Sequence, residues 1–248
     1  SDTVIAKSRY HETQGKYAPN GKGVFFLSNR SGSTQIWYEN TDTLTQISHS
    51  AGKVNDFIPM SETKVLYIES EKLFIYDSHQ PIREISLDLV PLTLHQVIDD
   101  QLVLSAQVGG KSVLVNLDLN THKYLELLNM DVDWAQVING SLMIANDNRG
   151  KLMKIVDGKI EKITALPELT IQWRYFLRES KDGSQAIYLQ DKALNIWQYD
   201  PLAETASIIG QFDENALFMT DFDPANNTML SNNFLDQQGQ LYQVTLNR

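Results

Sequence analysis

Short apolar runs separated by polar turns dominate this sequence, and the clearest group lies near its start. Val24–Leu27 is a continuous apolar run, as expected of a strand buried on both faces. A polar, Gly-containing loop at Ser28–Thr34 leads to a β-rich run at Gln35–Tyr38, and a third run follows at Leu44–Ile47 with polar residues alternating. Pro19-Asn20-Gly21-Lys22 is a turn signal, because Pro fixes φ and Asn-Gly tolerates positive φ. The pattern predicts three consecutive β-strands.

The Gln35-Ile36-Trp37 strand recurs along the chain at a steady spacing. Its equivalents are anchored at Ile36, Leu73, Leu114, Leu152, Ile196 and Leu241, which are 37, 41, 38, 44 and 45 residues apart. A spacing of roughly 40–50 residues is typical of propeller blades. An apolar strand precedes each anchor and a short strand follows most of them, so we predict an all-β fold: a six-bladed β-propeller of four-stranded antiparallel blades. The blades are expected at roughly 10–48, 53–86, 92–128, 131–164, 170–210 and 215–246.

The two ends of the chain complement each other. The last repeat ends at Tyr242–Leu246 without a fourth strand, whereas Thr3–Lys7 is a lone strand without a repeat. A propeller that stayed open would expose apolar faces and unpaired edges. We therefore predict one domain, 1–248, closed by residues 3–8 as the outer strand of the last blade. A large β-sandwich or jelly roll is the alternative fold, but it explains neither the six-fold recurrence nor the complementary ends.

Composition narrows the function classes. The chain has 248 residues, 42% of them hydrophobic and 21% charged, which is ordinary for a globular domain. Its net charge of −10 argues against direct contact with nucleic acid. It contains 0 cysteines, so disulfides, thiolate catalysis and Cys-based zinc sites are excluded. No apolar run is long enough to span a membrane. The start at Ser1-Asp2 suggests a piece of a longer protein or a processed one.

Motifs for catalysis, metal or cofactor binding are not visible. The 5 histidines form neither an HxH nor an HExxH arrangement, and there is no G-x-S-x-G elbow. The loop Asn29-Arg30-Ser31-Gly32 lacks the spaced glycines and the lysine of a phosphate-binding loop. Asp147-Asn148-Arg149-Gly150 lacks the further acidic positions of a calcium loop. We therefore expect no catalytic activity, no metal and no cofactor in this region.

Candidate binding residues fall at the starts of the innermost strands, which converge on the channel of a propeller. Trp134 and Trp173 belong to two of these strands. Aligning the strands by the turn that follows assigns five more residues to the channel or its rim: Asp56, His95, Asp133, Arg174 and Asp221. Buried charge is costly unless it is paired or used, so these positions are the predicted ligand or partner site. The loops that lead into these strands, here called the rim loops, are 49–53, 87–91, 129–133, 165–170 and 211–215.

One stretch of the chain resembles a known repeat. Residues Tyr17–Ser48 are similar to the repeat of TolB-type β-propellers. The motif consists of P-[ND]-G-K, an apolar strand, S-N-R-x-G, Q-I-W and a closing L-T-x-I-S. The third and fourth repeats of this chain lack P-D-G-K and S-x-R-x-G. The resemblance is therefore close in the first repeat and extends to the whole chain as architecture.

The resemblance implies a role outside the cytoplasm. Repeats of this kind also form the periplasmic half of membrane-anchored winged-helix transcriptional regulators of the ToxR and CadC type. By that resemblance the chain is a non-catalytic sensor or interaction domain that receives a protein or small-molecule signal at its funnel, with a membrane anchor outside these residues. A TolB-like envelope scaffold and the gating propeller of a prolyl-oligopeptidase-type peptidase are the alternatives. Sequence flanking residues 1 and 248 would distinguish the three.

Overall fold

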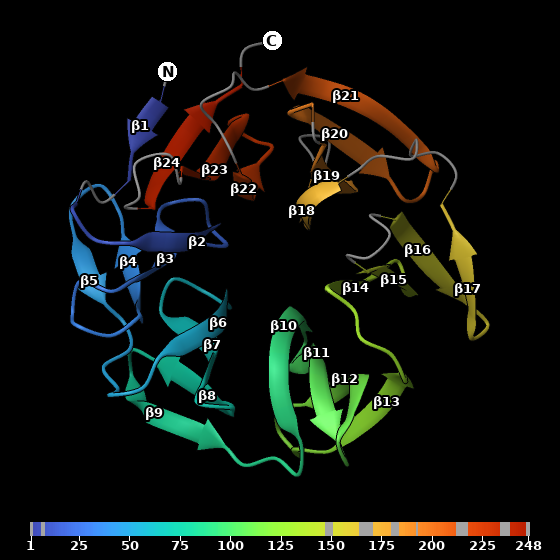
Figure 1. The fold of residues 1–248 in the computed structure, drawn as a ribbon, viewed down its shortest axis with the longest axis horizontal. Helices are drawn as coiled ribbons and strands as arrows, with labels where there is room; N and C mark the ends of the chain where they lie inside the picture. Colours follow the sequence, from blue (N-terminus) through green and yellow to red (C-terminus); the bar gives the residue numbers. More distant parts are fainter. Residues whose placement is uncertain are drawn as a thin grey trace. The chain divides into compact units, whose positions relative to one another are not determined.

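The computed structural model describes residues 2–5, 8–146, 151–163, 171–179, 184–191, 193–211, 218–233 and 239–246. These residues form strands and turns, with no helix among them (Figure 1). The strands make six four-stranded sheets, and the fold is the predicted six-bladed β-propeller. No helix in this part of the chain could cross a membrane.

Each sheet is an antiparallel meander of consecutive strands, except the last. The first sheet contains β2 (Glu12–Tyr17), β3 (Val24–Ser28), β4 (Gln35–Glu39) and β5 (Leu44–Gln46). The second contains β6 (Val54–Pro59), β7 (Lys64–Glu69), β8 (Lys72–Asp77) and β9 (Gln80–Ile85). The third contains β10 (Val90–Ile98), β11 (Gln101–Val108), β12 (Lys111–Asp118) and β13 (Tyr124–Leu128).

The remaining sheets follow in the same order. The fourth contains β14 (Trp134–Ile138), β15 (Ser141–Asn146), β16 (Lys151–Val156) and β17 (Lys159–Lys162). The fifth contains β18 (Ile171–Glu179), β19 (Gln185–Asp191), β20 (Asn195–Asp200) and β21 (Thr205–Gln211). The last contains β22 (Phe218–Asp223), β23 (Thr228–Asn233), β24 (Gln240–Thr245) and β1 (Asp2–Val4).

The last sheet confirms the predicted closure by the start of the chain. β1 pairs antiparallel with β24, with Asp2 opposite Val244 and Val4 opposite Tyr242. The Ile5 amide continues the ladder by donating to Leu241 O at 2.9 Å. The N-terminal strand therefore supplies the outer strand that the last repeat lacks, and β24 has a neighbour on both sides.

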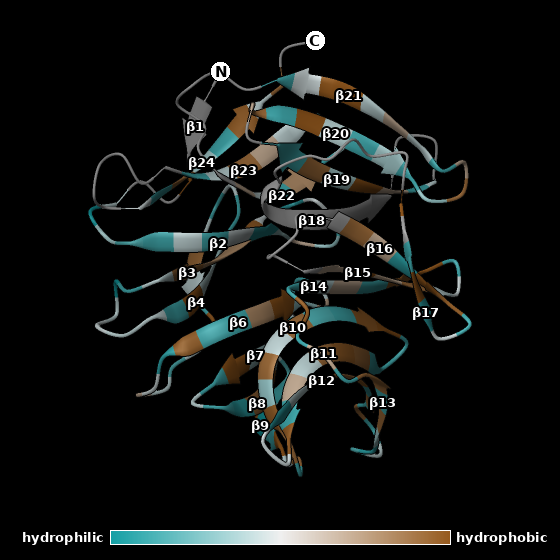
Figure 2. Ribbon diagram, turned by 45° about the vertical axis from the view of Figure 1, so that its right-hand side comes forward, coloured by the Kyte–Doolittle hydropathy of each residue, from teal (hydrophilic) through white to brown (hydrophobic). Residues whose placement is uncertain are grey.

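The chain divides into two compact units, residues 18–136 and residues 1–17 with 137–248. In the first unit, Phe25, Phe57 and Tyr67 are almost completely buried in one apolar cluster, and β7, β8, β11 and β12 supply much of a second. In the other unit Tyr188, Phe222 and Met229 form the centre of a cluster between the fifth and the last sheets. Apolar residues gather on the middle strands, and the turns are more polar (Figure 2).

The innermost strands carry an irregularity that the repeat pattern does not reveal. The ladder register shifts between Val54 and Asp56 in β6, and between Met219 and Asp221 in β22. A similar shift in β10 leaves His95 between its paired neighbours. A β-bulge of this kind bends the strand and re-aims the side chains beside it. Three of the predicted site residues therefore lie at bulges.

Candidate functional site

Five of the seven predicted site residues have described side chains. Asp56, His95, Asp133 and Trp134 belong to the unit of residues 18–136, and Asp221 belongs to the other unit. Trp173 and Arg174 lie on β18, of whose side chains nothing is described. The predicted rim loop 165–170 and most of 211–215 also lie outside the described residues. The prediction of a shared ligand site therefore stays a prediction.

Asp56 is engaged with the backbone of two strands. One carboxylate oxygen, Oδ1, accepts the amide of the next residue, Phe57, at 2.8 Å. The other, Oδ2, accepts the amide of Leu94 in β10 at 2.9 Å. β10 is the innermost strand of the following blade. Asp56 therefore ties two consecutive blades together by a charge-assisted hydrogen bond, which is stronger than a neutral one.

Asp221 repeats this arrangement in the other unit. Its Oδ1 accepts the amide of Phe222 at 2.7 Å, and its Oδ2 accepts the amide of Tyr17 in β2 at 2.8 Å. The Tyr17 hydroxyl lies 3.0 Å from Thr228 Oγ1, on the strand next to β22. Asp221 is completely buried, so these bonds replace the water that the carboxylate loses on folding. Both aspartates thus have a structural task that sequence reasoning missed.

His95 uses its side chain within its own blade. The ring is buried, and Nε2 lies 2.8 Å from Ser105 Oγ on β11. Ser105 donates its hydroxyl hydrogen to Val132 O at 3.2 Å. Because a serine hydroxyl has one hydrogen, the tautomer that matches both contacts has a hydrogen on Nε2, which donates to Ser105 Oγ. This chain of bonds reaches the rim loop that contains Asp133.

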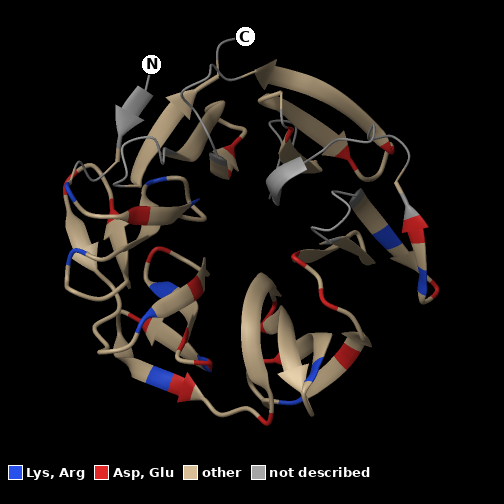
Figure 3. Cartoon of the chain, in the orientation of Figure 1, with Lys and Arg blue, Asp and Glu red and all other residues tan. Residues whose placement is uncertain are grey.

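The contacts connect three predicted positions within residues 18–136. Asp56 accepts a hydrogen bond from the amide of Leu94. The neighbouring His95 is hydrogen-bonded to Ser105, which donates to the carbonyl of Val132 beside Asp133. Asp133 itself is exposed, whereas Trp134 is 7% exposed and packs into the interior. Among these residues Asp133 is the one whose side chain is exposed. Asp131 lies exposed in the same loop, which appears acidic in Figure 3.

The rim loop 49–53 is held from below by a buried glutamine. Gln35 donates from Nε2 to Ser50 O at 3.2 Å and to Gly52 O at 2.8 Å, and its Oε1 accepts from Ser48 Oγ at 2.7 Å. A Cβ at Gly52 would overlap the carboxylate of Glu69, so a larger residue there would require that side chain to move. The exposed side chains of His49 and Lys53 therefore stand on a fixed base.

Another buried carboxylate organises the hairpin between β19 and β20, at the end of the sheet where β18 begins. Asp191, at the end of β19, accepts from the amides of Ala193 and Asn195, from Asn195 Nδ2 and from Trp197 Nε1. Burial raises the pKa of Asp191, but the hydrogen bonds from Trp197, Asn195 and Ala193 outweigh it, so the pKa lies below its ordinary value. The side chain is saturated with donors. It acts as a turn-forming group and leaves no free carboxylate for chemistry.

Metal binding has no support in the described part of the chain. No group of three or more His, Cys, Asp or Glu side chains there is arranged to hold an ion. Asp147-Asn148-Arg149-Gly150, the loop compared above with a calcium loop, lies outside the described residues.

Comparison with known proteins supports the fold. Neither a protein-family model nor a curated protein sequence matches the chain. Among solved structures, oligogalacturonate lyase from Vibrio parahaemolyticus aligns over 98% of this chain and 95% of its own, with a TM-score of 0.65 and 12% identity. TolB from Acinetobacter baumannii aligns over 92% of this chain and 62% of its own, with a TM-score of 0.61 and 14% identity.

A third neighbour is an extracellular domain. The extracellular domain of a one-component system from B. thetaiotaomicron aligns over 93% of this chain and 32% of its own, with a TM-score of 0.55 and 14% identity. At such identities the likeness shows a shared fold. It therefore confirms the propeller architecture and the resemblance to TolB at the level of fold.

The comparison with the lyase corrects one expectation. We expected no catalysis, because the sequence shows no nucleophile paired with a base. That expectation is contradicted, since an enzyme, oligogalacturonate lyase, covers nearly the whole of this chain with the same fold. A lyase works by elimination, which needs a proton acceptor and no covalent nucleophile. The absence of hydrolase motifs therefore argues against a hydrolase with a nucleophile but does not exclude a lyase. The activity of the present chain is not established by this likeness.

Proposed function

We propose that this propeller is an extracytoplasmic sensor or interaction domain, the periplasmic part of a membrane-anchored transcriptional regulator. The observation that carries the proposal is that rim loops with exposed charged residues are fixed by hydrogen bonds from buried side chains to their backbones. Gln35 holds the loop 49–53, and the Ser105–Val132 bond holds the loop 129–133. Loops positioned by a rigid scaffold commonly carry binding groups.

The similarity to an extracellular domain and to TolB supports an extracytoplasmic location. So does the TolB-type spelling of Tyr17–Ser48. The signal is a protein or small molecule that contacts the rim, and the exposed acidic residues Asp131 and Asp133 favour a partner with positive charge. Direct contact with nucleic acid is not proposed for this region, because its net charge is −10.

The location can be tested by cysteine labelling, because this region contains 0 cysteines. Lys111→Cys places a thiol at an exposed position in the full-length protein. We expect a membrane-impermeant maleimide to label this variant in intact cells whose outer envelope is permeable to it, and to label it more than the parent protein. Labelling that requires cell lysis would place the domain inside the cytoplasm and overturn the proposal.

The receiving surface can be tested by charge reversal. Asp133→Lys changes an exposed rim residue, and Asp42→Lys is a matched control in the β4–β5 turn. We expect the first variant to change the induced output of a transcriptional reporter and the second to leave it unchanged. If both signal as the parent does, the rim is not the receiving site. Co-purification of an envelope protein without any reporter response would favour the TolB-like scaffold instead.

A further inference from the structure

The outer strands of the blades differ in how they protect their open edges. An outer strand has one neighbour, so its remaining N–H and C=O groups are available for pairing with another chain. Proteins prevent this with charged residues, proline, bulges or short strands. Here β5 has three residues, β9 contains Pro81 and Arg83, β13 contains Glu126 and a register shift, and β17 contains Lys159 and Glu161.

β21 lacks most of these protections. It has seven residues, Thr205–Gln211, with the sequence TASIIGQ, and therefore neither charge nor proline. In Figure 3 the arrow of β21 is tan, without the blue or red that marks charged residues on the outer strands β9, β13 and β17. Ile208 is 51% exposed at its centre, and Leu202 is 70% exposed in the turn before it.

The backbone of β21 is paired along one side. Thr205–Ile208 pairs in regular register with Trp197–Asp200 of β20, and a bulge follows at Ile209. β21 is the last strand in its sheet, and no described residue pairs with its other edge. The part before the bulge is thus a regularly paired strand edge without charge and with an exposed isoleucine.

We infer that β21 is a self-association edge, on which a second copy of this chain adds its own β21 antiparallel about a two-fold axis. In such a pair the residue at the two-fold axis faces its own copy, so a charge at the centre of the strand would meet a like charge. The rest of the protein is strongly acidic, with a net charge of −10, and would repel a second copy. A neutral strand is therefore the surface on which two copies can approach. This inference stands independently of the proposed signalling role.

The pair is expected to be weak. A single strand pair buries much less than the ~1,200–2,000 Å² of stable protein interfaces. Association should therefore appear at high protein concentration, or where an anchor raises the local concentration.

The test is sedimentation equilibrium of the whole chain from about 10 μM to about 1 mM, the range in which such a small interface is populated. Ile208→Lys places a charge on the edge, and Ile160→Lys is a matched control, since Ile160 is 49% exposed on the outer strand β17. We expect the parent and Ile160→Lys to dimerise, and Ile208→Lys to weaken dimerisation roughly tenfold or more. A chain that stays monomeric throughout, or a dimer unaffected by Ile208→Lys, overturns the inference.

Hydrogen exchange of the parent protein gives a second readout that needs no variant. The backbone amides of Thr205–Gln211 that point away from β20 should become more protected as the concentration rises, while those of the outer strand β17 should not change. Equal protection at all concentrations, or an increase shared by both strands, contradicts pairing through β21.

Discussion

The second blade and the last blade use the same inter-blade link, but they are assembled differently. In both, an Asp-Phe pair follows a bulge in the innermost strand, and the aspartate accepts its own neighbour's amide and an amide of the next blade. The second blade, β6–β9, is one continuous piece of chain, whereas the last blade combines β22–β24 with β1 from the other end. Asp221 is completely buried and Asp56 is half-buried.

The comparison shows that the blade formed by both chain ends relies more strongly on buried polar contacts. Glu12 at the start of β2 and Asn232 on β23 are also buried, and Asn232 Nδ2 donates to Glu12 O. These bonds join β23 to β2, which is adjacent to it in space and distant in sequence. Such long-range hydrogen bonds join the first and last blades, which are not consecutive in the chain.

The largest effect is expected from removing the closing strand. Deletion of residues 1–8 exposes the edge of β24 and removes Ser8, whose hydroxyl donates to the buried Glu12 carboxylate at 2.7 Å. We expect a loss of several kcal/mol in the free energy of unfolding, a large part of the ~5–15 kcal/mol typical of a domain. Chemical denaturation measures it. Thr3→Ala is the control, because it keeps the backbone ladder, and equal midpoints for the deletion and the parent would show that closure contributes nothing.

The next largest effect is expected from replacing the two aspartates, and its size should differ between them. Asp221→Ala leaves two amides of the second unit without their acceptor in a buried site, and we expect a loss of about 3 kcal/mol. Asp56→Ala frees amides at a half-buried site that water can partly reach, so about 1 kcal/mol is expected. Urea denaturation of both variants tests the order. A larger loss for Asp56→Ala would mean that burial does not set the strength of the link.

A smaller effect concerns the carboxylate of Asp191, whose hydrogen bonds to described residues stay within its own hairpin. Its folded pKa is depressed, so its contribution to stability is present above the ordinary value of 3.8 and is lost as the pH falls through the folded pKa. Asp191→Asn should lower stability at pH 7 and flatten the decline of stability below about pH 4. Asp42→Asn, at an exposed turn, is the control. An unchanged slope below that pH in Asp191→Asn would contradict the assignment.

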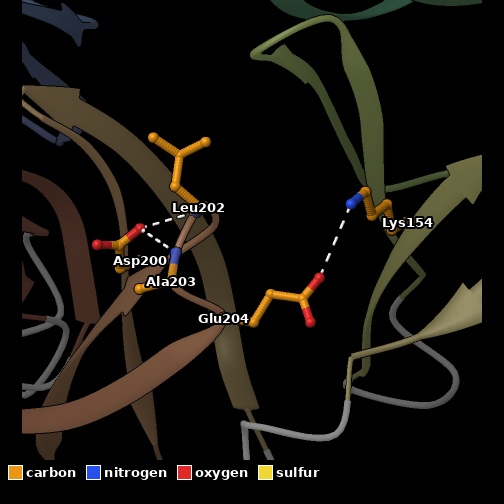
Figure 4. A network of polar contacts seen from close by, with 5 residues as sticks. All are labelled: Lys154, Asp200, Leu202, Ala203 and Glu204. Atoms are coloured by element: carbon orange, nitrogen blue, oxygen red, sulfur yellow. Dashed lines mark hydrogen bonds and ion pairs between the residues drawn. The ribbon is translucent and has the colours of Figure 1, made fainter.

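The smallest effect is expected from the surface ion pair in Figure 4. Lys154 Nζ lies 3.8 Å from Glu204 Oε1, with side chains 32% and 66% exposed. Such pairs are screened by water and salt, so Lys154→Ala should change the free energy of unfolding by less than about 0.5 kcal/mol. A loss comparable to that of Asp56→Ala would show that blades are joined by surface charge as well as by buried carboxylates.

Much of the fold could be predicted from local pattern, because strands of this propeller are short apolar runs with turn residues between them. The run Val24–Leu27 is buried throughout, as its continuous apolar character indicated. Closure was predictable because a missing strand and a spare strand are both visible in the sequence. The recurring strand was also correctly predicted at its anchors Ile36 and Ile196, which lie on β4 and β20.

The tasks of the polar residues were not predictable in the same way. A bulge shifts register by one residue, and nothing in the spelling around Asp56 or Asp221 marks it. Their partners Leu94 and Tyr17 are 38 and 204 residues away in sequence, so no local pattern contains them. The Ser105 hydroxyl on an apolar strand was a signal that could have been used, because a buried serine requires a partner.

Amide hydrogen exchange at two positions tests the central claim, that one carboxylate in each unit links consecutive blades. In Asp221→Ala the Tyr17 amide should exchange roughly tenfold faster or more, relative to the Leu94 amide in the same sample. In Asp56→Ala the order should reverse, with the Leu94 amide affected and the Tyr17 amide unchanged. Rates that rise together in both variants, or that do not change in either, would contradict the claim that these aspartates hold the blades through those amides.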